Sequence, residues 1–376
     1  MLRYSTFGPH IDKSDLHYVK DAMKPNNWYY NPYKYCELFE KKFAEYHNRK
    51  YSLFTPNCTT AIHLFLHSLN LKSTDEVIAS ENTWIATVSP VLLTKAKLVL
   101  CDVELSNWCI SLKEIKKKIN KNTKVIIATS IFGNMPDYNM LQKICKKKKI
   151  LLLEDSAESL GSTYKNKKSG SFGNAAVFSF HRTKTITSGE GGILLLDDKR
   201  LYLRCKMTRD HGRSSKTKDL LNDEFALKYM PFNLQCALAY SQFKKLNKLI
   251  QIKRKIFREY KKNLSVNKSI QFIQHNKINK NGCWATVIIL KKISKTNMRK
   301  IFKTLLKTGF LARPFFYPIS TLPAYKNFNE KKRIKIGSNK NAKYLSDHGI
   351  VLPSSYKMKE SEIKKICIII LSIFDN

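Results

Sequence analysis

The sequence predicts an α/β protein with a large, mainly parallel sheet domain and a smaller α+β C-terminal domain. Between about residues 50 and 200, brief apolar runs rich in branched residues alternate with segments of helical spacing. Such alternation is typical of a parallel sheet with helices on both faces. A long helical stretch then leads to a second group of short strands and helices. We therefore expect domains at 12–250 and 251–376, with the first residues of the chain packing nearby.

Each element of the larger domain is expected from its local pattern. Buried strands are predicted at Glu76–Ser80, Lys97–Val103, Lys124–Thr129, Ile150–Asp155, Ala175–Phe180 and Gly192–Leu196. Helices are predicted at Thr59–Leu69, Leu112–Ile119 and Tyr138–Lys148. Ligands of such sheets bind beyond the carboxyl ends of the strands. Asp155 and Ser179 fall at two of these ends, where a site is expected.

The second domain follows the long helical stretch, which covers Asn233–Leu264. Its strands are predicted at Ser269–Ile273, Cys283–Leu290 and Gly349–Leu352, and its helices at Lys295–Lys307 and Ser361–Phe374.

The composition is that of a globular protein without a membrane anchor. The chain has 376 residues, of which 43% are hydrophobic. Its first residues lack the apolar region of a signal peptide. The longest apolar run, Ile366–Phe374, is far shorter than the roughly 20 residues that cross a bilayer. We expect a cytoplasmic protein with no membrane span.

The cysteine pattern and the distribution of charge disfavour a disulfide framework, a metal site and a specific nucleic-acid partner. The nine cysteines form no C-x-x-C pair, which favours reduced thiols over a disulfide framework or a metal site. The net charge of +39 suggests a nucleic-acid partner. However, only 12 of the 68 basic residues are arginine, and the lysines are spread along the chain. We expect no specific nucleic acid, and weak polyanion binding stays open.

A lysine follows a buried strand inside a cluster of hydroxyls. Lys184 has Ser179, Thr183, Thr185 and Thr187 close to it in sequence. A desolvated lysine amine suits Schiff-base chemistry with a carbonyl, such as that of pyridoxal phosphate. An ordinary loop lysine is the alternative.

Acidic residues end the preceding apolar run. Pyridoxal phosphate needs a carboxylate beside its ring nitrogen, and Asp155 is the candidate. Glu158, three residues further on, is a candidate for the cofactor's ring edge or the substrate. The alternative for both residues is helix capping or a turn.

A phosphate turn is predicted where Asn57-Cys58-Thr59-Thr60-Ala61 precedes a helix. Thr59 and Thr60 would offer hydroxyls and first-turn amides, although such residues often only cap a helix. Trp84 is a candidate to stack on the cofactor ring, with a core position as the alternative. No G-x-G-x-x-G, G-x-x-x-x-G-K-[ST], H-E-x-x-H or G-x-S-x-G occurs, which disfavours the chemistries of those motifs.

Together these motifs, above all the run from Phe178 to Gly192, resemble the DegT/StrS family of pyridoxal-phosphate-dependent nucleotide-sugar aminotransferases. The resemblance covers nearly the whole chain and implies the fold of aspartate aminotransferase (fold type I). It implies that Lys184 holds the cofactor and shuttles protons, and that Asp155 pairs with the pyridine nitrogen. It also places Ser179 at the phosphate and Glu158 near the cofactor hydroxyl.

The resemblance further implies a shared site and a substrate-binding set. The implied cofactor-binding residues are Cys58, Thr59, Thr60, Trp84, Asp155, Glu158, Ser179, Lys184 and Lys228. Lys228 lies in a segment that, in the family, reaches the neighbouring subunit's cofactor, so a homodimer is implied. The implied substrate-binding residues are Trp28, Tyr29, Arg313 and Tyr317. The chain departs from the family at Cys58 (commonly Gly), Lys228 (often Asn) and Ser320 (often His).

The implied reaction moves an amino group from L-glutamate to a nucleotide-linked keto-deoxysugar for polysaccharide biosynthesis. Perosamine- or viosamine-forming enzymes, which aminate C4 of a nucleotide-4-keto-6-deoxyhexose, are the nearest model. One alternative is a sugar dehydratase of the same fold, in which relatives typically replace the cofactor lysine with His. The other is an inactive relative that binds polyanions. The nucleotide and the sugar stay open.

Overall fold

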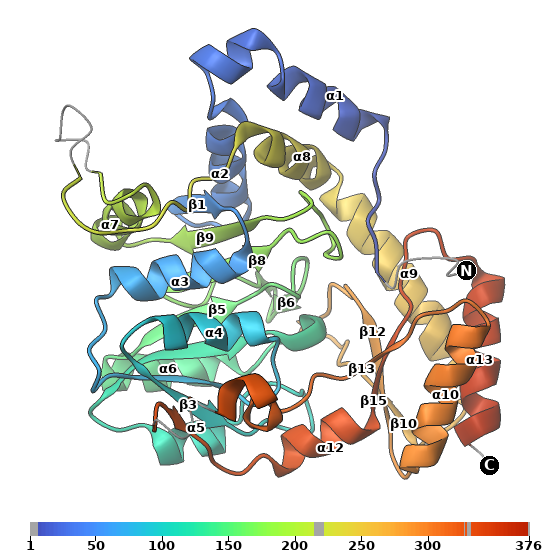
Figure 1. Cartoon of the computed structure of the whole chain (residues 1–376). Coiled ribbons are helices and arrows are strands. Elements are labelled where there is room, and N and C mark those ends of the chain that lie inside the picture. Colours follow the sequence, from blue (N-terminus) through green and yellow to red (C-terminus); the bar gives the residue numbers. More distant parts are fainter. Residues whose placement is uncertain (1–6, 214–221, 327, 329–331, 375–376) are drawn as a thin grey trace.

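The computed structural model describes residues 7–213, 222–326, 328 and 332–374 and has an α/β architecture (Figure 1). A large eight-stranded sheet has the strand order β1-β9-β8-β5-β4-β2-β3-β14. A four-stranded sheet, named here the second sheet, has the order β10-β12-β15-β13. A small three-stranded sheet, β11-β6-β7, completes the set.

The large sheet is mainly parallel, as predicted. Its strands are β1 Tyr51–Thr55, β2 Glu76–Ser80, β3 Lys97–Cys101, β4 Thr123–Thr129, β5 Leu151–Asp155, β8 Ala175–Ser179, β9 Gly192–Leu196 and β14 Ile334–Lys335. Only β9 pairs antiparallel, with β1 on one side and β8 on the other. The strands are buried almost throughout, which explains why they read as continuous apolar runs rather than as alternating ones.

Helices cover both faces of this sheet, because alternate side chains of each strand point to opposite faces. Val77 and Ala79 of β2 pack with helices α3 (Cys58–Ser68) and α4 (Ile85–Leu93). Ile78, between them, packs instead with helices α5 (Leu112–Lys118) and α6 (Tyr138–Lys148).

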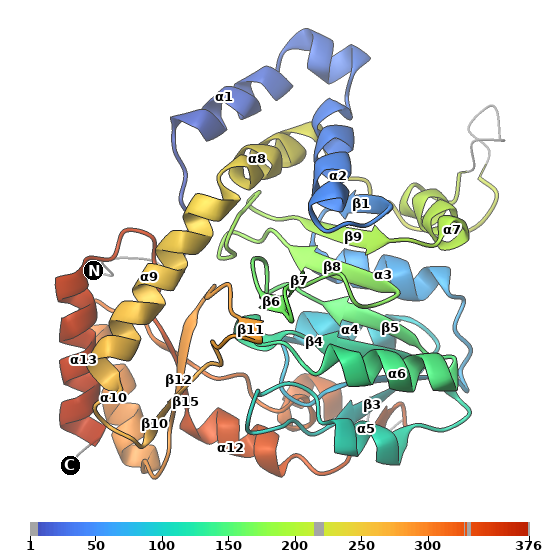
Figure 2. The same ribbon diagram turned by 180° about the vertical axis from the view of Figure 1, so that it is seen from behind.

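The remaining helices lie at the N-terminal end, at the edge of the large sheet and around the second sheet (Figures 1 and 2). Their bounds are α1 Lys13–Ala22, the π-helix η1 Asn26–Tyr30, α2 Lys34–Tyr46, α7 Lys199–Arg209, α8 Asn233–Lys244, α9 Leu246–Leu264, α10 Lys295–Lys307, α12 Lys340–His348 and α13 Glu360–Phe374. The long helical stretch of the sequence is thus two consecutive helices that meet at Lys245. Figure 2 shows them running from the large sheet to the second sheet.

The second sheet is antiparallel throughout its named strands. They are β10 Ile270–Phe272, β12 Thr286–Leu290, β13 Arg313–Pro314 and β15 Gly349–Leu352. One face packs on α9, α10 and α13. The other face joins a cluster with Phe7, Trp108 and Phe132, which come from the N-terminal segment and from loops of the large sheet. The two sheets therefore meet through this aromatic cluster.

Segments far apart in the sequence are combined in space. The small sheet joins the hairpin β6 (Thr163–Tyr164) and β7 (Lys167–Lys168) to β11 (Asn279–Lys280). Strand β14 adds to the edge of the large sheet, where Ile334 pairs with Leu98 of β3. The domain division at residue 250 remains a prediction, and α9 runs across it.

All nine cysteines are buried and have free thiols. Among the described residues, no group of three or more His, Cys, Asp and Glu side chains is arranged to hold a metal ion. No described helix is both long enough and apolar enough to span a bilayer.

Candidate active site

A cavity of about 630 Å³ lies where β5 and β8 end, and residues beside the second sheet close one side of it. Nine residues singled out from the sequence line it, namely Cys58, Thr59, Thr60, Trp84, Asp155, Glu158, Ser179, Lys184 and Arg313. They come from five separate parts of the chain, and the fold brings them to one place. A cavity thus lies at the strand ends where the sequence predicts a site, and the roles of these residues remain predictions.

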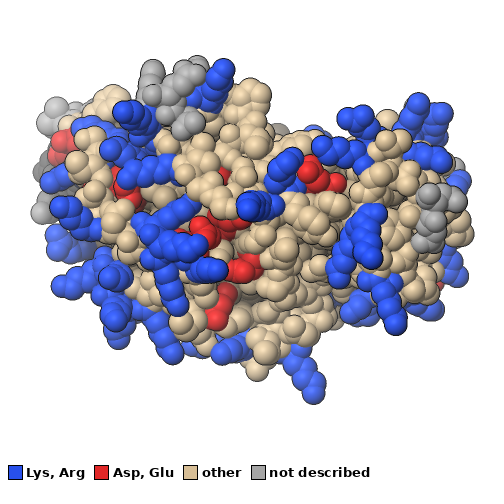
Figure 3. Space-filling model, turned by 90° about the horizontal axis from the view of Figure 1, so that it is seen from below, with Lys and Arg blue, Asp and Glu red and all other residues tan. Residues whose placement is uncertain are grey.

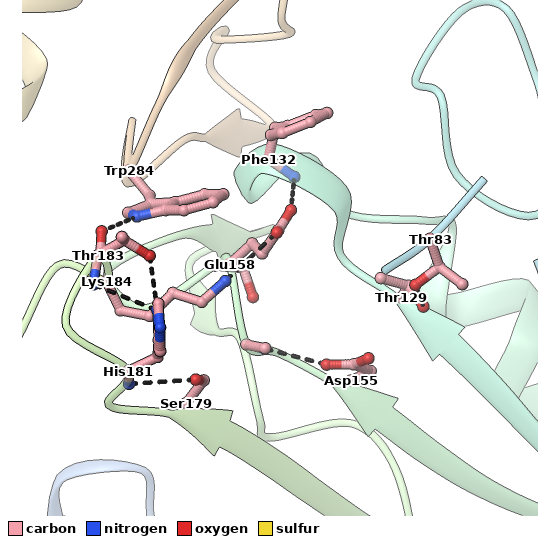
Figure 4. Close-up of polar contacts among 12 residues, drawn as sticks. Thr83, Thr129, Phe132, Asp155, Glu158, Ser179, His181, Thr183, Lys184 and Trp284 are labelled. Carbon is pink, nitrogen blue, oxygen red and sulfur yellow. Dashed lines mark hydrogen bonds and ion pairs between the residues drawn. The ribbon is translucent and has the colours of Figure 1, made fainter. Parts of the chain in front are cut away.

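Lys184 points its amine into this cavity from the loop after β8 (Figure 4). Its Nζ lies 3.3 Å from Oε1 of Glu158 and 4.0 Å from the ring centre of Trp284. The side chain is only 14% exposed. The amine is thus held between a carboxylate and an aromatic face, and an ordinary solvent-facing loop lysine is excluded.

Glu158 links Lys184 to the loop after β4. Its Oε2 accepts a hydrogen bond of 2.9 Å from the backbone amide of Phe132. Burial raises the pKa of the Glu158 carboxyl above its ordinary value, and the nearby Lys184 ammonium opposes that shift. Glu158 therefore orients the lysine and can exchange a proton with it.

Asp155 ends β5 at the base of the cavity. Its Oδ2 accepts a hydrogen bond of 2.5 Å from the hydroxyl of Thr87, and its Oδ1 accepts one of 3.2 Å from the amide of Ala157. Burial raises the pKa of this carboxyl, whereas the Thr87 hydrogen bond lowers it. Among the described residues, no lysine or arginine forms an ion pair with Asp155.

A chain of hydroxyls supports Asp155, and sequence reasoning missed it. Thr87 is hydrogen-bonded to Thr83 at 2.7 Å, and Thr83 to Thr129 at 3.3 Å. Thr87 lies in the first turn of α4, whereas Thr83 precedes Trp84, the N-cap of that helix. The short separation of the two threonines in the sequence was the available signal for their contact.

The start of α3 has the form of an anion site. Asn57 caps the helix, because its Oδ1 accepts from the amide of Thr60 at 2.9 Å, and the Thr60 hydroxyl bonds back to Asn57. The first amides of a helix have no partner within the helix and favour an anion. The hydroxyl of Thr60 is thus used in capping, while the first turn still faces the cavity.

The position of Gly192 explains why the run from Phe178 to Gly192 ends in glycine. A Cβ at this position would lie 2.5 Å from backbone atoms of Asn57 and Cys58. Strand β9 therefore packs directly against the start of α3, and only glycine permits this approach.

The other predicted residues lie in different surroundings. Trp84 is 57% exposed on the cavity wall, 5.9 Å from the ring of Phe316, so its alternative interpretation as a core residue is wrong. Ser179 accepts a hydrogen bond of 3.3 Å from the amide of His181, a lining residue that sequence reasoning missed.

Four predicted residues do not line the cavity in this chain. Trp28 and Tyr29 are exposed in the π-helix η1, and Tyr317 is exposed after β13. Lys228 forms an ion pair of 2.8 Å with Asp210. Their roles at the cofactor or substrate remain predictions.

The cavity residues fit pyridoxal phosphate. The volume is within the range of about 300–1,000 Å³ that small-molecule sites occupy. The cavity presents a lysine amine, a helix start for a phosphate and aromatic rings for stacking. Lys184 lowers the pKa of the buried Asp155 carboxyl from a distance, but no described Lys or Arg forms an ion pair with it, so a protonated ring nitrogen would supply a direct cationic partner.

Comparison with known proteins also indicates an aminotransferase. The model of the DegT/DnrJ/EryC1/StrS aminotransferase family matches residues 9–371. A GDP-perosamine synthase from Vibrio cholerae is 31% identical over 371 residues, covering 98% of each chain. One from Escherichia coli O157:H7 is 30% identical over 363 residues, covering 96% of each. The structure of Helicobacter pylori PseC, an aminotransferase involved in the biosynthesis of pseudoaminic acid, aligns with a TM-score of 0.89, 25% identity and 99% coverage of each chain.

Proposed function

The chain belongs to the DegT/DnrJ/EryC1/StrS aminotransferase family, and from that premise we propose its reaction. With pyridoxal phosphate as cofactor, it moves an amino group from L-glutamate to a keto carbon of a nucleotide-linked deoxysugar. The acceptor position is C4 of a nucleotide-4-keto-6-deoxyhexose. The relatives named GDP-perosamine synthase support this choice of acceptor.

The observation that carries the proposal is the position of Lys184. Its amine faces the same cavity as Asp155 and the start of α3. The sugar dehydratases of this fold typically carry His in place of the cofactor lysine, so a lysine favours amination over dehydration. The polyanion-binding alternative explains neither the buried acid–lysine contact nor the hydroxyl chain beneath Asp155.

Different residues of the chain have different roles in the proposed reaction. Pyridoxal phosphate, when bound, supplies the electron sink that amino transfer needs. Asp155 holds a negative charge for the ring nitrogen, and the first turn of α3 binds the phosphate. Lys184 takes up and returns protons, and Glu158 orients its amine at 3.3 Å. Trp284, 5% exposed, excludes water from one side of that amine.

The distribution of charge on one face of the molecule favours the enzyme over a nucleic-acid-binding protein. On the face shown in Figure 3, Lys and Arg side chains are spread over both ends, with acidic side chains between them. A nucleic-acid site would gather its basic residues in one stripe or patch.

The proposal also includes the setting of the enzyme. We expect a cytoplasmic homodimer in which Lys228 of one subunit serves the cofactor site of the other, and a product used for a surface polysaccharide. The exposed aromatic residues Trp28, Tyr29 and Tyr317 are expected to contact the sugar nucleotide.

Purified protein tests the proposal. With pyridoxal phosphate it should turn yellow, and L-glutamate should bleach the colour. Lys184→Ala should abolish both effects, whereas Lys248→Ala, an exposed lysine on α9, should preserve them. Incubation with glutamate and a panel of GDP-, UDP- and dTDP-keto-sugars, followed by product mass and NMR, identifies the acceptor. A wild-type protein that takes up no pyridoxal phosphate would refute the proposed function.

A further inference from the structure

Two aromatic side chains outside the large sheet hold the backbone on both sides of Lys184. The indole Nε1 of Trp284 donates a hydrogen bond of 2.6 Å to the carbonyl of Thr183 (Figure 4). The hydroxyl of Tyr356 donates one of 2.6 Å to the carbonyl of Thr185. Thr183 and Thr185 are the residues immediately before and after the lysine.

Both donors belong to segments next to the second sheet. Trp284 comes just before β12, and Tyr356 follows β15. Lys184 itself lies on the loop between β8 and β9 of the large sheet. We propose that Trp284 and Tyr356 are positioning residues for Lys184, through which the second sheet sets the place of the reacting amine. The proposal rests on the aminotransferase function proposed above.

Trp284 confines the amine as well as the backbone. Its ring centre lies 4.0 Å from Nζ, on a contact distinct from that of Glu158 at 3.3 Å. Because the indole is only 5% exposed, it cannot swing into solvent without disturbing the core. The Trp284 side chain therefore restrains both the backbone beside Lys184 and the amine at the end of the lysine side chain.

The two aromatic side chains are themselves held by a common buried frame. The ring of Phe7 lies 4.8 Å from that of Trp284. The amine of Lys253, on α9, lies 4.2 Å from the ring centre of Tyr356 and donates to the carbonyls of Phe7 and Ser354. Trp284 and Tyr356 thus share support through Phe7 and Lys253, and they are expected to move together with the second sheet.

Local contacts also restrain the loop next to the lysine. The Lys184 amide donates to the carbonyl of His181 at 2.9 Å, and the Thr183 hydroxyl is hydrogen-bonded to Nδ1 of His181 at 2.9 Å. Without the two aromatic donors, the position of Nζ would depend on these short-range contacts and on Glu158. Misplacement of a reacting group by about 1 Å can cost on the order of 100-fold in rate. The two hydrogen bonds therefore matter for catalysis more than for binding.

Conservative substitutions test this inference. Tyr356→Phe removes only the hydroxyl, and Trp284→Phe removes the indole donor while keeping an aromatic ring. Each should lower kcat about tenfold, and the double variant more, with KM for glutamate within about twofold. Tyr260→Phe is the matched control, because the Tyr260 hydroxyl also donates a buried hydrogen bond beside the second sheet, 2.8 Å to the carbonyl of Pro353. It should keep the wild-type kcat.

A second measurement needs neither cofactor nor turnover. Trace acetylation of the cofactor-free protein, followed by mass spectrometry of the peptide that carries Lys184, reports how freely its amine moves. Trp284→Phe and Tyr356→Phe should speed labelling of Lys184 severalfold relative to the other lysines, and Tyr260→Phe should not.

The outcomes separate the two proposals. Faster Lys184 labelling with an inactive wild-type protein would support the positioning role and refute the aminotransferase function. Active variants that match Tyr260→Phe in both kcat and labelling would refute the positioning role and leave the function standing. An equal loss of thermal stability in all three variants, with no selective change at Lys184, would also refute it.

Discussion

Thr87 and Asp155 are joined by a hydrogen bond of 2.5 Å from the threonine hydroxyl to Oδ2 of the carboxyl group. The bond connects the first turn of α4 to the end of β5. It lowers the pKa of a carboxyl that burial otherwise raises. Thr87 thus helps to keep Asp155 charged, which is the form that a cationic ring nitrogen requires.

Thr87→Val should lower the amination rate by roughly 10- to 100-fold at neutral pH, since a lost hydrogen bond to a charged group costs about 1.5–3 kcal/mol. The pKa of Asp155 should rise further, so part of the activity should return as the pH is raised. A pH–rate profile checks this result.

Thr83→Val is the matched control for that experiment. It removes the next hydroxyl in the chain, which contacts Thr87 at 2.7 Å, but leaves the Asp155 hydrogen bond in place. Its rate should stay within about threefold of wild type. Equal losses in both variants would contradict a specific role for the Thr87 contact.

Glu158→Gln should change how stability depends on pH. Burial raises the pKa of Glu158 above its ordinary value of 4.5, so the folded protein holds a proton that the unfolded chain has released. The free energy of unfolding contributed by this group therefore falls as the pH rises from 4.5 through the raised pKa. The variant lacks that fall, so it should gain stability relative to wild type over this range.

Urea unfolding between pH 4 and 7 measures the difference. Glu37→Gln, which removes an exposed carboxylate from α2, controls for the loss of one negative charge. Parallel curves for wild type and Glu158→Gln would show that Glu158 does not titrate differently in the folded protein.

Lys253→Met should flatten the stability profile on the alkaline side. Burial lowers the pKa of Lys253 from 10.5 to about 7, so above pH 7 the unfolded chain binds a proton that the folded protein has released. The stability of wild type should therefore rise relative to the variant between pH 7 and 10.5, by at most about 1.4 kcal/mol per pH unit. Urea unfolding at several pH values measures this slope.

The exposed Lys248, which precedes Lys253 on α9, provides the control. Lys248→Met should keep the slope of wild type. A Lys253→Met protein with an unchanged slope would mean that the buried amine stays protonated across this range.

Gly192→Ala should destabilise the protein by about 1–3 kcal/mol, as overpacking of a tight contact typically does. The added Cβ would lie 2.5 Å from backbone atoms of Asn57 and Cys58, and those atoms belong to the start of α3. Thermal unfolding measures the loss, and weaker uptake of pyridoxal phosphate should accompany it.

Gly337→Ala is the companion variant, because its Cβ would meet mainly the flexible end of Lys118. We expect a smaller loss of stability there. If both variants lost the same amount, backbone contact at Gly192 would not be the cause.

Much of the fold could be predicted from local pattern. Strands β2, β9 and β15 have the predicted bounds, because each is a short apolar run that is buried along its whole length. Strands β1 and β14 were not predicted. β1 contains few branched residues, and β14 is only Ile334–Lys335, too short to carry a pattern.

Some residues of the site could likewise be predicted from local sequence pattern, and others could not. Lys184 and Asp155 could be found because they end or follow buried strands of one sheet. Trp284 and Tyr356 could not, since their contacts with the lysine loop join positions about a hundred or more residues apart. A single sequence contains no periodicity that encodes such a contact.

Strand β14 is synthesised late, and until then one edge of the large sheet has no partner strand. Its partner β3 leaves the ribosome long before Ile334, so until then the large sheet ends in an open strand. An open edge recruits other chains. A fragment that stops at residue 250 would keep that edge, and we expect it to aggregate on expression although it contains Lys184, Asp155 and the start of α3. The last third of the chain would thus act as a cap that protects the first two thirds during biosynthesis.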